Sequence, residues 1–311
     1  MKSICNLSYA LSFIFLFSIS LTNAATFNVT DDGDAGTNTL RWAIAQANAN
    51  SEADIININV TGPINVSSAN FEINDDELTI NGNGVTIDCG NNNGAFDINN
   101  YSDVVMNNLT IQNADGTGLA YAGGIEISSY GNLEMNNCTI TSCATTDRGG
   151  AFYLLTSGNL VLRNSVVSNN SASSDGGGIY CDPAGTFQIN NSTIGGNTSG
   201  GSGGGIYYNN STFGSSISNS TIIENTADDN GGGIYGRGNT LSITNTTITG
   251  NTASQDGGGV CYNGGLLNIE NSTISGNTSN DDGGGLFLNA TGTKTITNST
   301  IYGNEANGTS G

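Results

Sequence analysis

Residues 256–277 read DGGGVCYNGGLLNIENSTISGN and hold the two markers that recur along this chain. One marker is a glycine pair followed by an apolar residue, and it returns at steps of 26 to 28 residues. The other is an Asn three residues before an Ile or Val. The apolar marker residues are Ile125, Ala151, Ile179, Ile206, Ile234, Val260 and Leu286 after glycine, and Ile111, Ile140, Val167, Ile194, Ile222, Ile248, Ile274 and Ile301 after Asn. Two markers that repeat in step predict a stacked array.

Each repeat contains three short runs in which apolar and polar residues alternate, as in 260–262, 267–269 and 273–275. Runs of this length and period are typical of strands. Three strands in 26 to 28 residues leave no room for a crossover helix, so each strand must lie on its counterpart one turn earlier. We therefore predict an all-β fold, a right-handed parallel β-helix with about 27 residues and three strands per coil.

Asparagine stands in two columns of this predicted stack, one before and one after the marker Ile or Val. Stacked amides can form hydrogen-bonded ladders between coils, so we expect both columns to stabilise the stack. The first column is Asn108, Asn137, Asn164, Asn191, Asn219, Asn245, Asn271 and Asn298, and the second is Asn170, Asn197, Asn225, Asn251, Asn277 and Asn304, preceded by Cys143. Most Asn-x-Ser/Thr sequons coincide with these asparagines, and we expect them to be buried.

Five cysteines follow the first two dozen residues, with no close-spaced metal pattern. Cys138 and Cys143 occupy positions that Ser, Thr or Asn hold in other repeats, so we expect small buried side chains. A single disulfide bridge between Cys138 and Cys143 is the alternative.

The start of the chain differs from the repeats. Residues 1–24 are typical of a secretory signal peptide, and no later apolar run is long enough to cross a membrane. Residues 25–54 predict an N-terminal cap of a strand, a loop and an amphipathic helix from about Thr39 to Asn48. Residues 55–311 form the predicted β-helix, which stops where the next glycine pair is due. We therefore expect a truncated C-terminus and end-to-end self-association of the last coil.

The chain has a formal net charge of −20 and contains no His. Such an excess of negative charge excludes nucleic acid as a partner. Arg148 and Arg163 lie in one repeat, and we interpret both as surface charges. The sequence predicts no catalytic, cofactor-binding or metal-binding residue, and it leaves open whether the chain is an enzyme.

An acidic column immediately before the glycine corners is the one pattern that points to a metal. It consists of Asp147, Asp175, Asp256 and Asp282, with Ser202 and Asn230 in the same column. Stacked carboxylates repel each other, and calcium could relieve that repulsion through oxygen ligands. Because Ser and Asn interrupt the column, we interpret it as a row of solvated turns, with calcium binding as the alternative.

An outward column of threonines resembles the flat faces of ice-binding β-helices. It consists of Thr110, Thr139, Thr193, Thr221, Thr247, Thr273 and Thr300. The companion positions include Gly195, Ile223 and Tyr302, which is irregular for a lattice match. Ice binding is therefore only a second alternative function.

Two stretches of the sequence resemble known secreted proteins. Residues 31–50, DDGDAGTNTLRWAIAQANAN, look like the N-terminal segment of secreted bacterial right-handed β-helix proteins. The body, in which GGGIY alternates with NSTISGN, is similar to the repeats of chlamydial polymorphic membrane proteins and related adhesins, although Ile or Val replaces their Phe.

The resemblance implies a secreted or surface-displayed passenger domain of the bacterial envelope that acts in adhesion or as a structural stalk. Its expected partners are host or surface glycans or proteins. The alternative is a carbohydrate-active enzyme, a pectate-lyase-like polysaccharide lyase or a glycoside hydrolase, with a groove on the β-helix.

Overall fold

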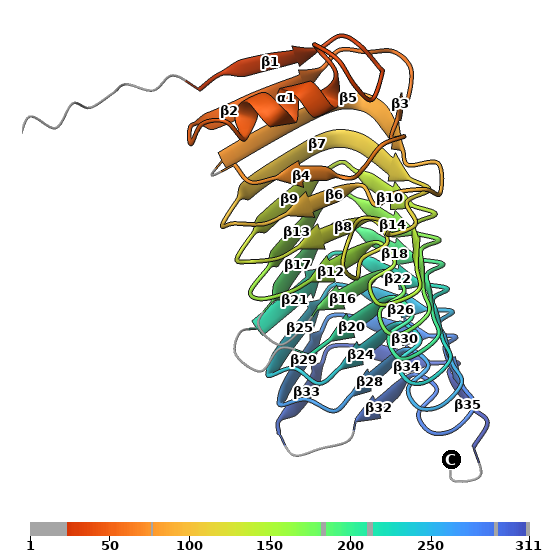
Figure 1. Ribbon diagram of the computed structural model, residues 1–311. Coiled ribbons are helices and arrows are strands. Elements are labelled where there is room, and N and C mark those ends of the chain that lie inside the picture. Colours follow the sequence, from red (N-terminus) through yellow and green to blue (C-terminus); the bar gives the residue numbers. More distant parts are fainter. Residues whose placement is uncertain (1–23, 76, 182–184, 210–213, 289–291, 309–311) are drawn as a thin grey trace, which may run out of the picture.

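The computed structural model describes residues 24–75, 77–181, 185–209, 214–288 and 292–308. The chain coils into a β-solenoid of about ten turns, in which strands of successive coils pair in parallel (Figure 1). The predicted right-handed parallel β-helix is confirmed. The predicted signal peptide lies, up to residue 23, outside the described residues.

Three parallel sheets form the walls of the solenoid. The largest consists of β1 (Thr26–Val29), β2 (Ala53–Ile58), β3 (Ile64–Asn65), β5 (Glu77–Asp88), β7 (Asp103–Gln112), β9 (Asn132–Asn136), β10 (Thr139–Thr141), β13 (Asn159–Arg163), β14 (Val166–Ser168), β17 (Thr186–Asn190), β18 (Thr193–Gly195), β21 (Gly214–Ser218), β22 (Thr221–Ile223), β25 (Thr240–Thr244), β26 (Thr247–Thr249), β29 (Leu266–Glu270), β30 (Thr273–Ser275), β33 (Lys294–Thr297) and β34 (Thr300–Tyr302). The second consists of β4 (Phe71–Ile73), β6 (Phe96–Ile98), β8 (Ile125–Ile127), β12 (Phe152–Leu154), β16 (Ile179–Cys181), β20 (Ile206–Tyr208), β24 (Ile234–Gly236), β28 (Val260–Tyr262) and β32 (Leu286–Leu288). The third consists of β11 (Ala144–Thr145), β15 (Ser171–Ala172), β19 (Thr198–Ser199), β23 (Thr226–Ala227), β27 (Thr252–Ala253), β31 (Thr278–Ser279) and β35 (Glu305–Ala306).

A regular coil contains four strands, as in β28, β29, β30 and β31. The first three are the predicted strands. The prediction of three strands missed the fourth, because its two residues are too short to show a period. The marker residues Ile248 and Ile274 are fully buried, so the predicted inward face of the repeat is confirmed.

The first column of asparagines does not lie inside the stack, and its predicted burial is wrong. These residues are exposed and turn the chain between the two strands that each coil adds to the largest sheet, as Asn164 does between β13 and β14. Their φ angles are close to 50°. Asn adopts this left-handed conformation more readily than most residues, so the residue type suits the turn. Two pairs of the column also form the predicted amide bonds, from Nδ2 of Asn191 to Oδ1 of Asn164 and from Nδ2 of Asn245 to Oδ1 of Asn219. The sequons of this column are therefore exposed, not buried.

The second column forms the buried ladder. The Nδ2 atom of Asn225 donates to Oδ1 of Asn251 at 2.9 Å and to the carbonyl O of Ile194 at 3.0 Å. Its Oδ1 accepts hydrogen bonds from the backbone N and from Nδ2 of Asn197, at 3.0 and 2.9 Å. Asn170, Asn197, Asn225, Asn251 and Asn277 repeat this amide-to-amide bond from coil to coil. The predicted stabilising ladder is confirmed for this column.

At the glycine corners, the backbone turns and packs closely against the neighbouring coil. Gly257 has a φ of 68°, and a Cβ on Gly258 would lie 2.3 Å from the carbonyl O of Thr278. Side chains are thus excluded by both conformation and packing. Four tyrosines of the second sheet and Tyr121, from the segment before β8, stack with ring centroids 4.7 to 5.2 Å apart; the four are Tyr153, Tyr180, Tyr207 and Tyr235. They build a small second core outside the solenoid.

The predicted cap helix is present as α1 (Leu40–Ala47), with Thr39 as N-cap and Asn48 as C-cap. Its apolar face, which includes Leu40 and Ile44, is buried against the first coils (Figure 1). The helix therefore covers the apolar interior at this end of the rod.

The cysteines at 89, 138, 143, 181 and 261 are buried thiols outside any disulfide, so the alternative Cys138–Cys143 bridge is not formed. Burial raises the pKa of Cys143 and of Cys261 to about 12. These thiols are packing groups, as predicted.

Candidate binding groove

The acidic column predicted from the sequence is tied to the backbone of neighbouring coils. Oδ1 of Asp175 accepts a hydrogen bond from the backbone N of Ser202 at 2.8 Å. Oδ1 of Asn230 accepts one from Asp256 N, and Oδ1 of Asp256 one from Asp282 N, both at 3.1 Å. The column is thus a third ladder, with a structural role beyond that of a solvated turn.

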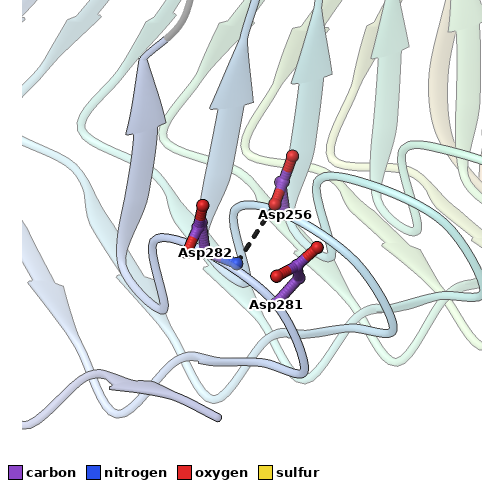
Figure 2. Close-up of side chains that lie close together, drawn as sticks. All are labelled: Asp256, Asp281 and Asp282. Atoms are coloured by element: carbon purple, nitrogen blue, oxygen red, sulfur yellow. Dashed lines mark hydrogen bonds between the residues drawn. The ribbon is translucent and has the colours of Figure 1, made fainter. Parts of the chain in front are cut away.

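Three carboxylates gather at one corner of this column. Asp256, Asp281 and Asp282 each place an oxygen within 4.8 Å of the others (Figure 2). Oxygen ligands suit a hard cation such as Ca²⁺, which takes six to eight of them. The cluster could therefore supply part of a coordination shell, with solvent supplying the rest.

The two arginines of one repeat do not converge. Arg148 Nε lies 3.9 and 4.0 Å from the carboxylates of Asp147 and Asp175, and its guanidinium lies over the ring of Tyr180. Arg163 is on β13 of the largest sheet, where its Nε lies 3.2 Å from Oε1 of Glu134. Each cation thus belongs to a local contact on a different wall.

A groove of about 440 Å³ runs across the outer face of β7, β9, β13 and β17. Its volume is within the range of about 300–1,000 Å³ that is usual for ligand sites. Val105, Glu134, Val161 and Gln188 occupy one line of outward positions along its floor. The groove exists because these strands alternate buried and outward residues, so a mixed apolar and polar surface stays accessible.

One edge of the groove is a polar ladder. Asn132 Nδ2 donates to Oδ1 of Asp103 at 2.6 Å, and Asn159 Nδ2 donates to Oδ1 of Asn132 at 2.7 Å. Thr186 Oγ1 continues the ladder by donating to Oδ1 of Asn159. Asn132 and Asn159 also donate to the carbonyl groups of Tyr130 and Ser157. Their N–H groups are therefore occupied, and this edge offers mainly oxygen acceptors to a ligand.

A second ladder lies two residues beyond the floor on β7 and β9 and continues onto β5 and β2. Asn81 Nδ2 donates to Asn57 Oδ1 at 2.9 Å, and Asn107 and Asn136 extend the row with bonds of 3.1 Å. Each bond uses one of the two N–H groups of an amide. On β7 and β9, the groove floor is thus flanked by acceptors on one side and by amides with spare donors on the other, whereas Arg163 holds the equivalent position on β13.

Two exposed tyrosines stand at the corner where β7 and β9 begin. The rings of Tyr101 and Tyr130 are parallel, with centroids 4.9 Å apart, and are 67% and 48% exposed. Their φ angles are 64° and 67°, and the preceding Asn100 and Ser129 also have positive φ. Such a conformation costs about 1–3 kcal/mol for a residue other than glycine, and it recurs at Thr156 and Ser157 of the next coil.

Two carboxyl groups with raised pKa lie side by side on the second sheet. Asp97 of β6 and Glu126 of β8 are register partners. Burial raises the pKa of Asp97, and burial also raises the pKa of Glu126, which is 5% exposed. Glu126 accepts hydrogen bonds from the backbone N of Ala120 and Tyr121, at 2.9 and 3.0 Å. It therefore holds the segment before β8 in place.

The predicted threonine column lies on the outer face of the short strands, such as Thr247 and Thr273 on β26 and β30. Gly195 and Ile223 share its companion column in direct register. The irregularity expected from the sequence is therefore present on the folded surface.

The groove, its two ladders and the exposed tyrosines were missed by the sequence reasoning. A usable signal existed for the tyrosines, because Tyr101 and Tyr130 stand two residues before Asp103 and Asn132, which are register partners. Using this signal requires the register between β7 and β9. The two sequence markers do not give that register, because the early coils are irregular.

Two family models match different parts of the chain. Residues 46–146 match the model of a pectate lyase-like adhesive domain, and residues 163–310 match the model of the periplasmic copper-binding protein NosD. A comparison with curated proteins gave no match. Each model covers less than half of the chain, and together they support a parallel β-helix repeat protein of the cell surface or periplasm. Of the four groove strands, β7 and β9 lie in the part similar to the adhesive domain, and β13 and β17 lie beyond it.

Among the residues that the structure describes, α1 is too short and too polar to cross a membrane, and no other helix could do so.

Proposed function

We propose that this chain is an adhesion module of the bacterial surface, which binds a partner along the groove without chemically changing it. The observation that carries the proposal is the state of the groove carboxylates. Oδ1 of Asp103 accepts a hydrogen bond from Asn132, and Glu134 is paired with Arg163. Acid–base catalysis needs a carboxyl group poised to release a proton to the substrate, whereas each carboxylate here is held as an acceptor by a donor of the wall.

The rigidity of the rod also supports display. Ladders of buried amides join each coil to the next, and such quasi-one-dimensional stacks present extended surfaces. The match to an adhesive domain over residues 46–146 agrees with this proposal.

Enzymatic action is the second candidate, and the Asp97–Glu126 pair is the observation that favours it. Two adjacent carboxyl groups with raised pKa are typical of acid–base sites. Glu126, however, is almost fully buried and holds the backbone of residues 120 and 121. The groove is therefore the stronger candidate.

The test measures retention of the chain on immobilised polysaccharides and envelope material, with a parallel assay for reducing and unsaturated ends. Val161→Tyr should abolish retention, because the larger side chain fills the groove floor on β13. Val166→Tyr is the matched control, since Val166 is an equally half-buried outward valine on β14 of the same coil. Release of new chain ends would overturn the proposal, as would equal retention of both variants.

A further inference from the structure

The geometry of the groove points to its ligand class: we propose that it binds an uncharged glycan chain, with Tyr101 and Tyr130 as an aromatic stacking subsite. This inference rests on the proposed binding function and adds the chemistry of the partner.

The charge of the surface argues against a polyanion. The whole chain carries −20, and the groove lining contributes Asp103 and Glu134. Arg163 is the cation in contact with it, and it is paired with Glu134. Like charges at short range disfavour binding, so an acidic polysaccharide would meet net repulsion along the groove.

The hydrogen-bonding character of the two edges selects hydroxyl groups. The ladder of Asp103, Asn132 and Asn159 presents oxygen acceptors, whereas Asn107 and Asn136 keep a spare N–H each. A hydroxyl group both donates and accepts, so it satisfies either edge. A carboxylate or sulfate only accepts, and it would face unsatisfied acceptors on the first edge.

The apolar parts of the groove fit the faces of sugar rings. Val105 and Val161 place aliphatic groups on the floor between the two polar edges. A pyranose has the same distribution, with C–H groups on its faces and hydroxyls around its edge. The aromatic pair adds a flat surface beyond the Asp103–Asn132 edge, because Tyr101 and Tyr130 are exposed and precede these two register partners by two residues.

The length of the groove sets the length of the glycan segment. Four strands at a spacing of about 4.8 Å span about 14 Å, and a pyranose with its linkage advances a chain by about one strand spacing. We therefore expect three to four sugar units to fill the site.

The experiment is calorimetric titration of the full chain with soluble neutral oligosaccharides of two to six units from several linkage classes, and with polygalacturonate oligomers. Affinity for a neutral series should rise up to about four units and then level off. The polygalacturonate series should bind at least tenfold more weakly. Preference for the acidic series, or no binding of any neutral series, overturns the ligand class.

The aromatic subsite is tested by the double variant Tyr101→Ala/Tyr130→Ala, which should lower affinity about tenfold or more. Tyr101→Phe/Tyr130→Phe should retain it, because the rings remain. Tyr302→Ala is the matched control, since Tyr302 is 61% exposed and lies on β34 far along the rod. Unchanged affinity of the double alanine variant with an unchanged melting temperature overturns the subsite.

These outcomes separate the inference from the proposed function. If Val161→Tyr abolishes retention on envelope material while no neutral glycan binds, adhesion through the groove stands and the ligand class is wrong. If chain ends are released, the proposed function itself is wrong.

Discussion

The inner and the outer side of the solenoid wall both carry stacked amides, yet the two sets differ in burial. On the inner side, Asn197, Asn225 and Asn251 are fully buried. On the outer side, Asn107 and Asn136 stack in the early coils, and exposed turn asparagines such as Asn245 do so in the later coils. The inward ladder uses its donors and acceptors within the fold, whereas the outward ladder keeps some for a ligand.

The tyrosines show the same contrast. Tyr153, Tyr180 and Tyr207 stack as a buried column on the second sheet, while Tyr101 and Tyr130 stack in contact with solvent. One kind of contact thus stabilises the coils where the rings are buried and forms a candidate site where they are exposed. The difference indicates that burial of the stacked groups, and not their position along the rod, separates stability from recognition.

The largest expected effect comes from breaking the inward ladder. Asn225→Leu leaves the buried backbone N of Asn197 without its acceptor and removes the amide donor to the carbonyl O of Ile194. At about 1–3 kcal/mol for a buried group without a partner, the loss should be about 1–3 kcal/mol. Chemical denaturation followed by circular dichroism measures it.

Asn107→Leu is the matched control, because it breaks an equivalent amide ladder on the outer face. Solvent can replace the lost bonds there, so the cost should stay below about 1 kcal/mol. Equal losses in the two variants would show that burial of the ladder is not what stabilises the coils.

The next largest effect is a gain in stability, and it comes from the turn at Ser129 and Tyr130. The double change Ser129→Asn/Tyr130→Gly puts an Asn-Gly pair where both residues have positive φ, which is the preferred sequence for such a turn. We expect a gain of about 1 kcal/mol, because Asn and Gly adopt this conformation at lower cost. The melting temperature should rise while glycan affinity falls.

A stability that falls with this change would mean that Tyr130 stabilises the coil through its ring contact with Tyr101, and that the turn holds no strain. Tyr130→Gly alone serves as the control for loss of the ring.

The period of the markers was sufficient to predict the coil, because buried Ile and Val must recur once per turn. The cap helix followed from a local signal, the N-cap Thr39 before an amphipathic run. Which of the two asparagine columns points into the solenoid and which points to solvent could not be predicted in this way. Both columns have the same residue type and period, and they differ in backbone conformation, with φ near 50° in the first column.

The candidate site was not predictable for a related reason. Its ladders join Asn81 to Asn107 and Asp103 to Asn132, at separations of 26 and 29 residues. These steps vary because the early coils differ in loop length, so no fixed period aligns the contributing side chains. Only the register of folded strands brings Asp103, Asn132 and Asn159 into one row.

The smallest expected effect concerns the N-terminal end of the early coils, where Asp34 holds the cap. Its Oδ2 accepts hydrogen bonds from the backbone and hydroxyl groups of Ser67 and Ser68, and its Oδ1 lies 2.7 Å from Arg41 Nη2. Burial alone would raise the pKa of Asp34, but the hydrogen bonds from Ser68 and Arg41 outweigh it and hold the pKa below its usual value. The stabilisation is therefore complete above the unfolded-state pKa of about 3.9 and is lost as the pH falls through the lower folded-state value.

Trp42 is the single tryptophan of the chain and lies on α1, with its ring centroid 6.0 Å from that of Phe27. Its fluorescence should shift as the cap loosens on acidification, at a pH where circular dichroism still reports intact coils. Asp34→Asn should lower the thermal stability of the cap at neutral pH and remove most of this acid response, because the titrating carboxylate is gone. An identical fluorescence titration in the variant would show that other carboxylates control the cap, and that the early coils are held at this end by the apolar face of α1 alone.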